Sequence, residues 1–576
     1  MNKNELPSTG SDRYPLTRRS FIRGGGIASG LILSSGIHSL LSSCSSPSST
    51  TKIPENNTVA RTPNPKFIPD LEINLKAAPK TVQILSGQPT QVWSYAAELV
   101  KGDPNSLQAI PDSYLGPIIR VQKGQRVRVN FQNNLPQGQS SIVHWHGLIL
   151  PEDMDGHPRF AIEPGQTYVY EFEVINRAGM NWFHPHPDQL TGQQAYAGLA
   201  GLFIVTDPEE SALNLPSGAY EVPIVLQDRT LDTNNQLLYL GSKIGTPRNS
   251  GMGGMGGMNN SDRSGSGMGN MSSMMGFLGE QLFVNGKPDF TLAAATRVYR
   301  LRILNGSNSR IYKLGWSNGN PLTVIGTDGS LLSQPVERKY VMLAPGERLD
   351  VWADFSKLKV GTELALNSLA FSGAENVGGS SMGGMMGSGN APELGAAMKL
   401  FNVKLDRAET EPLKLPSKLA ALPLLRPADA INAAQPRPVE LALQGMKWTI
   451  NGQLFEMNAA TPQETVKLNS IEQWEIINKL NPGAMMDAKG MAHPIHFHGV
   501  KFQVISRQVL PELAVGWQTV KDGYVDEGFK DTVMVMPGER VKLLMKFEDY
   551  SGLFAYHCHI LEHEDAGMMR NYRIQG

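Results

Sequence analysis

The chain has 576 residues, a formal net charge of −1 and 40% hydrophobic residues. A chain of this length can fold as three or four domains with a large buried core, and its 59 glycines and 38 prolines argue against long helices. The near-neutral charge excludes an electrostatic case for a nucleic-acid partner. The only cysteines are Cys44 and Cys558, so we expect no disulfide within the mature chain.

The first 44 residues have the layout of an export signal. Arg18 and Arg19 precede Phe21 and an apolar stretch that contains Gly and Ser and runs from Ile27 to Leu41, as in twin-arginine signals. The apolar run is short for a transmembrane span, and a basic pair before a signal anchor is the alternative. We expect the twin-arginine export machinery to carry the chain out of the cytoplasm.

Leu41-Ser42-Ser43-Cys44 closes this segment and resembles a bacterial lipobox, in which the cysteine becomes the lipidated first residue of the mature protein. A chance cysteine near an ordinary cleavage site is the alternative, because small residues are expected there in any case. The Ser- and Pro-rich residues that follow predict a flexible tether. We therefore predict a signal with lipobox over 1–44, a linker over 45–77, and a periplasmic or extracytoplasmic protein held at a membrane by lipid on Cys44.

Two motifs recur three times along the rest of the chain. A Pro-Gly turn before an alternating strand occurs at 164–165, 345–346 and 537–538, with spacings of 181 and 192 residues. A second strand motif ends at Asn130, Asn305 and Asn478, which lie 175 and 173 residues apart. Three copies predict three homologous domains. Short apolar/polar alternations between Gly, Pro and Asn turns predict that each domain is a β-sandwich or Greek-key barrel.

Ten of the twelve histidines fall in four short clusters. The clusters are His144-Trp145-His146-Gly147, His184-Pro185-His186-Pro187, His493-Pro494-Ile495-His496-Phe497-His498-Gly499, and His557-Cys558-His559 with His563. In extended backbone successive side chains point to opposite faces, so both histidines of each His-x-His pair share a face. One such cluster is more often a set of core or surface histidines, but four with matching parity indicate shared metal centres.

Cys558 lies between two of these histidines and points to the opposite face of the strand. His493 precedes His496 by three residues, so it also faces away from the other histidines of its cluster and belongs with Cys558. Together with His563 and Met568 they form the Cys/His/Met set of a blue copper centre, in which the thioether is a weak axial ligand. An electron would enter at the Cys558 sulfur and leave through the adjacent peptides. The other eight imidazoles are enough for three more copper ions: 144, 146, 184, 186, 496, 498, 557 and 559.

The four segments have the forms HxHG, HxH, HxxHxH and HCHxxxHxxxxM in this order, and the chain therefore resembles the multicopper oxidases. The repeats extend the likeness over residues 78–576. The resemblance implies an all-β fold of three tandem cupredoxin (Greek-key β-sandwich) domains: 78–207, 208–405 with Met/Gly-rich insertions, and 406–576. Two clusters lie in the first domain and two in the last, so we expect the eight-histidine site where domains 1 and 3 meet.

The resemblance also implies four copper ions per chain, one type 1, one type 2 and two type 3, which couple one-electron oxidation of a donor to reduction of O2 to water. It assigns His493, Cys558, His563 and Met568 to type 1 copper, His144 and His496 to type 2, and His146, His184, His186, His498, His557 and His559 to type 3. Asp155 and Glu564 match carboxylates that pass protons to oxygen intermediates. From the sequence alone, either of these could instead be a surface carboxylate.

Two segments rich in Gly and Met, 251–276 and 379–389, bear on the electron donor. Thioethers favour Cu(I), so these segments, with Met491, would collect cuprous ions. Alternatively they are low-complexity insertions in which methionine is merely tolerated. The resemblance to bacterial cuprous oxidases is partial, because Met491 has a counterpart there but the expected aspartate position holds Lys489, with Asp487 two residues earlier.

Three hypotheses follow for the function. The first is an oxidase that serves copper tolerance by converting Cu(I) to Cu(II). The second keeps the enzyme but makes the donor a small phenol or aromatic amine, as in laccases, with the Met-rich segments as lids. The third is a copper-sequestering surface lipoprotein, which oxygen consumption would distinguish from the other two.

Overall fold

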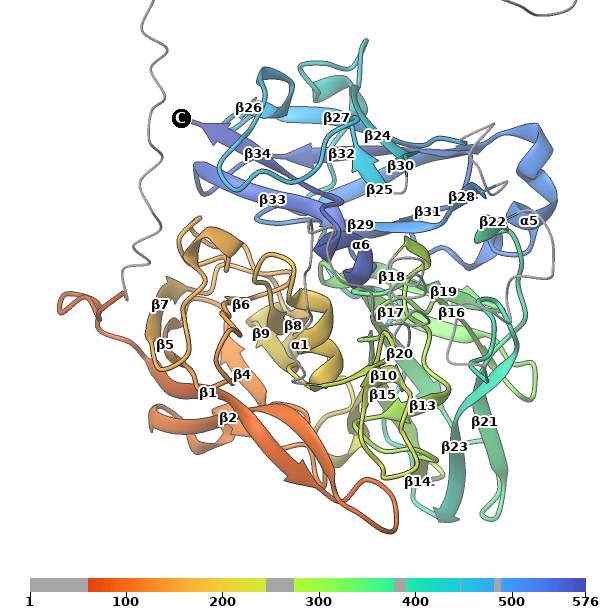
Figure 1. The fold of residues 1–576 in the computed structure, drawn as a ribbon. Coiled ribbons are helices and arrows are strands. Elements are labelled where there is room, and N and C mark those ends of the chain that lie inside the picture. Colours follow the sequence, from red (N-terminus) through yellow and green to blue (C-terminus); the bar gives the residue numbers. More distant parts are fainter. Residues whose placement is uncertain (1–60, 245–273, 378–389, 446, 481–487) are drawn as a thin grey trace, which may run out of the picture. The chain divides into compact units, whose positions relative to one another are not determined.

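The computed structural model describes residues 61–244, 274–377, 390–445, 447–480 and 488–576. The described residues all fall within one compact unit, 56–576, and they form mainly β-strands (Figure 1). The predicted export signal, Cys44, Asp487, residues 251–273 and residues 379–389 lie outside the described part. Within that part, no helix has the length and hydropathy needed to cross a membrane.

The first domain is a pair of β-sheets with the strand orders β2-β1-β5-β7 and β3-β4-β9-β8-β6. The strands are β1 Leu71–Val82, β2 Thr90–Lys101, β3 Leu107–Gln108, β4 Ile118–Gln122, β5 Arg126–Asn133, β6 Val143–His144, β7 Thr167–Glu173, β8 Gly179–Pro185 and β9 Gly201–Thr206. Because β1 starts at Leu71 and pairs with β5 over its first seven residues, the linker expected over 45–77 contains the start of this sandwich. Alternating hydrophobic residues at the start of β1 point into its core.

The second domain repeats this plan with the orders β13-β10-β15-β20-β17-β18 and β14-β23-β21-β16-β19. Its strands are β10 Glu221–Arg229, β13 Gln281–Val284, β14 Thr291–Ala295, β15 Val298–Asn305, β16 Tyr312–Trp316, β17 Leu322–Thr327, β18 Leu331–Arg338, β19 Val341–Leu343, β20 Arg348–Asp354, β21 Glu363–Ser368 and β23 Met398–Arg407. Two small ladders are separate from these sheets: β11 Leu238–Tyr239 with β12 Ser242–Lys243, and β22 Glu375–Val377 with β28 Ala488–Met491.

The third domain has the orders β25-β24-β27-β32-β30 and β26-β34-β33-β29-β31. Its strands are β24 Arg437–Gln444, β25 Lys447–Ile450, β26 Thr465–Lys467, β27 Ile471–Asn478, β29 His493–Phe497, β30 Phe502–Val509, β31 Thr532–Val535, β32 Glu539–Lys546, β33 Gly552–Cys558 and β34 Met569–Gln575. The helices are short: α1 Thr191–Ala197, α2 Pro208–Ser211, α5 Ala514–Gln518 and α6 Leu561–Asp565, with 3-10 turns at Pro104–Ser106, Pro158–Phe160, Gly218–Tyr220, Pro427–Asp429, Pro462–Glu464, Pro511–Leu513 and Lys521–Gly523.

The three pairs of sheets share a common core of strand order and pairing, although their edge strands differ. This confirms the three tandem cupredoxin domains. In each first sheet one parallel pair recurs, as β1·β5, β10·β15 and β24·β27. In each second sheet the parallel pair is β4·β9, β14·β23 or β26·β34. The three Pro-Gly turns precede β7, β20 and β32, which pair with β5, β15 and β27. Each sandwich has its own buried core, and two further apolar clusters join domain 2 to domains 1 and 3.

The asparagine of the first repeat copy is Asn133, and the equivalence with Asn130 was wrong. Asn133, Asn305 and Asn478 each donate two side-chain hydrogen bonds to backbone carbonyls. Each also accepts a bond at its own carbonyl from the glycine of the neighbouring Pro-Gly turn. Asn130 instead bonds Glu72 and Asn74 across the strands. The corrected spacings are 172 and 173 residues.

We predict that Asn133→Ala lowers the apparent free energy of unfolding by about 2–4 kcal/mol, because the buried carbonyl of Ile162 and the half-buried carbonyl of Gln139 each lose a donor. Asn130→Ala is the matched control, and we expect a loss within about 1 kcal/mol because its partners are side chains nearer the surface. Urea titration of both variants measures the difference. Equal losses would show that the buried asparagine does not hold the turn.

Candidate metal centre

The histidine clusters lie on topologically equivalent strands of the first and last domains. In domain 1 they occupy β6 and β8, where His144 is paired with His184. In domain 3 they occupy β29 and β33, where His496 is paired with His557. The same two places in domain 2 are taken by β16 and β21, which carry no histidine. Domains 1 and 3 therefore contribute the same pair of strands, and the histidines of the two pairs meet between them.

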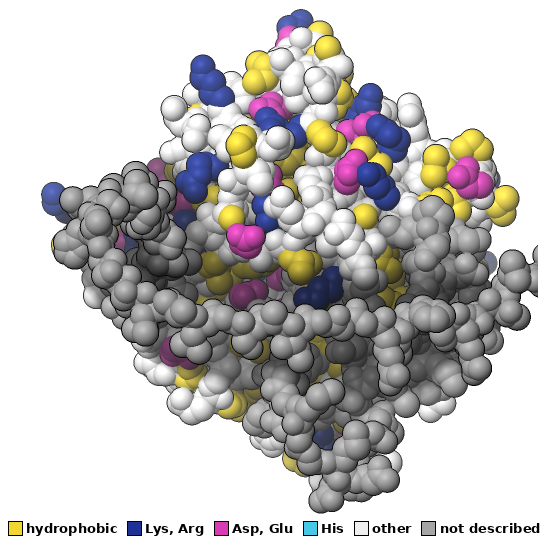
Figure 2. All heavy atoms as spheres, turned by 45° about the horizontal axis from the view of Figure 1, so that its top comes forward, with side chains coloured by type: hydrophobic (Ala, Val, Ile, Leu, Met, Phe, Trp, Pro, Cys, Tyr) yellow, Lys and Arg dark blue, Asp and Glu magenta, His cyan; other side chains and the backbone are white. Residues whose placement is uncertain are grey.

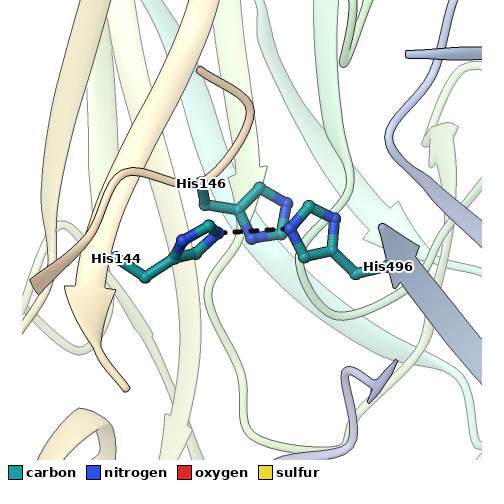
Figure 3. Close-up of side chains that lie close together, drawn as sticks. All are labelled: His144, His146 and His496. Atoms are coloured by element: carbon teal, nitrogen blue, oxygen red, sulfur yellow. Dashed lines mark hydrogen bonds between the residues drawn. The ribbon is translucent and has the colours of Figure 1, made fainter. Parts of the chain in front are cut away.

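The eight imidazoles converge as the strand parity predicts. His144 and His496, from different domains, bring their Nε2 atoms to 3.2 Å (Figure 3). The Nε2 atom of His557 lies 3.2 Å from that of His186 and 3.1 Å from that of His498. The possible metal-holding groups are His144 with His146 and His496, His146 with His184 and His559, and His186 with His498 and His557. The last two groups contain the six histidines that the family resemblance assigns to the type 3 coppers.

In six of the eight histidines one ring nitrogen contacts an acceptor, so the other is free to face a metal. Five of these contacts are made by Nδ1, at 2.7–3.1 Å. His144 bonds the carbonyl of Asp155, and His498 bonds its carboxylate. His496 bonds the carbonyl of Asp531, His184 that of Pro185, and His557 that of Cys558. His146 is reversed, because its Nε2 atom lies 3.1 Å from Asp531 Oδ1. These contacts fix the orientation of those six rings.

A separate sulfur site lies on the other face of β33. Cys558 Sγ is 3.4 Å from His493 Nδ1 and 3.6 Å from His563 Nδ1, and all three side chains are buried. Met568 is also buried, and its carbonyl accepts a hydrogen bond from the Cys558 amide at 3.1 Å. The structure thus brings together the predicted type 1 residues, with Cys558 pointing away from His557 and His559.

The donor set fits copper. All ten cluster histidines are at most 1% exposed, and no histidine is visible among the described residues on the face drawn in Figure 2. Burial lowers the pKa of His144, His184, His496 and His498 well below the usual range, so these rings are neutral, as metal ligands must be. Both ring nitrogens of His559, and His184 Nε2, have no hydrogen-bond partner within the described residues. Such buried nitrogens are costly unless a metal binds them.

The two carboxyl groups predicted to move protons lie beside the eight histidines. Asp155 Oδ2 accepts from His498 Nδ1 at 2.7 Å, and burial raises the pKa of Asp155 well above its usual value. Glu564 lies 3.1 Å from His557 Nδ1 and 3.6 Å from His186 Nε2. Burial alone would raise the pKa of Glu564, but the two neighbouring imidazoles outweigh it, and the pKa lies below its usual value. Both groups are placed for proton exchange, and that role stays a prediction.

Sequence reasoning missed two sets of contacts to the ligands. Asp531 belongs to none of the sequence motifs described above. It contacts His146 through its side chain and His496 through its backbone carbonyl. Burial alone would raise the pKa of Asp531, but Arg348 and Lys501 lower it well below its usual range. At the sulfur site, the carbonyl of Met274 accepts from His563 Nε2 and from Trp448 Nε1, each at 2.8 Å. A backbone carbonyl leaves no signal in a sequence.

The metal-free protein should lose stability as the pH falls from 6.5 to 4. In the fold, burial lowers the pKa of His186 to about 4 and that of His559 and His563 to about 3, from 6.5. Below pH 6.5 the unfolded chain therefore binds more protons than the folded one, and folding weakens until the pH reaches the folded values. Urea midpoints of metal-free and copper-loaded protein measure this. A metal-free midpoint that stays level over this range would contradict it.

Known proteins share these features. Two family models, each described as multicopper oxidase, match residues 91–210 and 431–575. A laccase of Bacillus subtilis is 31% identical over 84% of this chain and 90% of its own length. The multicopper oxidase mco of Staphylococcus aureus is 30% identical over 83% of this chain and 86% of its length. The McoA multicopper oxidase of Aquifex aeolicus, a solved structure, superposes with a TM-score of 0.68 at 29% identity and covers 88% of this chain and 97% of its own.

The sulfur site, the eight converging imidazoles and the relatives agree on the cofactor, which is four copper ions of types 1, 2 and 3. The chain belongs to the multicopper oxidases, a family of copper-dependent oxidoreductases.

Proposed function

We propose that this oxidase takes its electrons from Cu(I) and serves copper tolerance. Four cuprous ions, one dioxygen and four protons would give four cupric ions and two waters. The bound coppers supply one-electron acceptance at the sulfur site and reduction of dioxygen at the eight-histidine site. The chain supplies the link between them, because Cys558 is joined by single peptide units to His557 and His559.

The observation that carries the proposal is the contact of Met274 with the sulfur site. Met274 lies two residues before the end of the predicted Met-rich segment 251–276, and its carbonyl accepts a hydrogen bond from His563 Nε2 at 2.8 Å. Its side chain is 7% exposed and packs in the same buried cluster as Cys558, Met568 and Met491. The end of the segment that the sequence marks as a collector of soft cations thus lies against a copper ligand.

Burial of the sulfur site also favours a small donor. His493 and His563 are fully buried, and Trp448 packs against both rings at centroid distances of 4.5 and 5.7 Å. A phenol ring must displace one of these groups to touch an imidazole, whereas a thioether-bound ion needs only a nearby sulfur. Met491 is 3% exposed and lies two residues before His493. Its proposed partner Asp487 lies outside the described residues.

A laccase-type donor is the second candidate, because the Bacillus subtilis relative bears the name laccase. In that case the Met274 contact would act as a cover that restricts phenols and aromatic amines. The third hypothesis is copper sequestration without turnover. It gives no reason for an eight-histidine site with two adjacent carboxyl groups.

Replacing Met252, Met255, Met258, Met268 and Met271 with serine tests the donor. We expect kcat/KM for Cu(I) to fall about tenfold or more, because soft ligands are removed and none of the assigned copper ligands is changed. Oxidation of a bulky phenol by the same preparation is the internal control, and its rate should stay level or rise. An unchanged rate with Cu(I) together with a faster rate with the phenol would favour the laccase-type candidate.

We further propose that the enzyme is exported by the twin-arginine machinery and anchored by lipid on Cys44. Support comes from the sequence alone, namely the Arg18-Arg19 pair, the apolar stretch and the Leu-Ser-Ser-Cys ending. Cys44→Ala should release the protein from membranes, and Arg18→Lys with Arg19→Lys should keep it inside the cell. Cell fractionation followed by immunoblotting measures both results. A Cys44→Ala protein that stays with membranes would contradict the lipid anchor.

A further inference from the structure

Arg348 of the middle domain lies at the junction of all three domains. Its guanidinium bonds both carboxylate oxygens of Asp531 in domain 3, each at 2.6 Å. It also donates to the carbonyl of Met180 in domain 1, at 3.2 Å, and to the carbonyls of Asp328 and Gly346 in its own domain. Arg348 and Asp531 are 1% and 0% exposed. This is a buried, bidentate ion pair, and its two parallel hydrogen bonds fix the relative orientation of the two side chains.

The other side of this ion pair bears on a copper ligand. Asp531 Oδ1 lies 3.1 Å from His146 Nε2, and Thr532 Oγ1 lies 3.2 Å from the same nitrogen. With Nε2 donating to the carboxylate, Nδ1 is the nitrogen of His146 that has no partner within the described residues. A metal-bound imidazole whose other nitrogen donates to a carboxylate has a fixed tautomer and a more basic ligand atom.

Two glycines make room for this arrangement. Gly147, which follows His146, has a φ of +94°, and an added Cβ would come within 2.6 Å of Arg348 Nη2 and 2.9 Å of Asp531 Oδ2. The ion pair therefore packs directly on the segment that carries His144 and His146. Gly346, in the Pro-Gly turn before Arg348, has a φ of +84°, and its Cβ would lie 2.8 Å from the ring of His559. The middle domain thus packs closely on two of the segments that carry the eight histidines, next to His146 and at His559.

We propose that Arg348 and Asp531 are positioning residues for the eight-histidine centre: Arg348 of the middle domain holds Asp531, and Asp531 holds His146 with Nδ1 toward its copper. The domain that provides no copper ligand in the described residues would thereby set the geometry of one. The proposal is independent of the electron donor, and it gives a physical reason for the glycine in the His144–Gly147 motif.

Copper retention in a chelator series tests the proposal, with the blue absorption of Cys558-bound copper as an internal standard. In Asp531→Asn, which keeps the size of the side chain, we expect the eight-histidine centre to hold copper about 10–100-fold more weakly. The blue band should be unchanged, since the sulfur site lies on the other face of β33. The paramagnetic resonance signal of type 2 copper should shift or weaken in step with copper loss.

Lys530→Met is the matched control. Lys530 is a buried cation of domain 3 that lies 3.2 Å from both Asp328 and Glu347 of domain 2, so its loss breaks a contact between the same two domains. We expect it to lower the melting temperature while leaving copper retention and both spectra intact. Arg348→Met should lower the melting temperature and also copper retention at the eight-histidine centre. If Asp531→Asn retains copper like the unmodified enzyme, or if Lys530→Met loses it equally, the positioning role is refuted.

Discussion

Adjacent residues of a strand point to opposite faces, and the chemistry of this protein depends on that rule at Cys558. His557 and His559 point into the eight-histidine centre, while Cys558 points into the sulfur site. β33 lies inside its sheet, between β34 and β29, with Cys558 opposite Ile495. A slip of one residue would exchange the two faces, and pairing on both sides prevents it. One strand can therefore connect two copper sites at fixed distance.

The second constraint is that no domain holds the eight-histidine centre alone. Domains 1 and 3 each contribute two histidine clusters on equivalent strands. The centre therefore forms only when the two sandwiches pack together. Burying neutral imidazoles with unpartnered nitrogens is unfavourable without metal, and the surrounding hydrogen bonds must hold the rings in place until copper binds. The middle domain contributes to this through its apolar contacts with both neighbours and through Arg348.

Residue parity and repeat spacing predicted much of the fold and of the site. The grouping of His493 with Cys558, and of eight other histidines together, needed only local backbone geometry, and the structure brings these groups together. The three repeats predicted three sandwiches, although Asn130 was matched in place of Asn133, because both follow similar alternations and only the side-chain bonds differ. The prediction missed the start of β1, because the short alternation of hydrophobic and polar residues before residue 78 resembles a linker.

What the sequence could not reveal are contacts between segments far apart in the chain. Asp531 reaches His146 across 385 residues, and Arg348 reaches Asp531 across 183. Met274 acts through a backbone carbonyl, which any residue carries. Such contacts depend on how the sandwiches pack, and no local pattern encodes them.

The central claim is that one sulfur site and one three-metal centre share the strand that carries Cys558. Anomalous diffraction at the copper edge, from crystals of the copper-loaded enzyme, tests it most directly. The account predicts one peak among His493, Cys558 and His563, and three peaks enclosed by the eight histidines of domains 1 and 3. No copper among His493, Cys558 and His563, or fewer than three copper sites within the eight imidazoles at full loading, would contradict it.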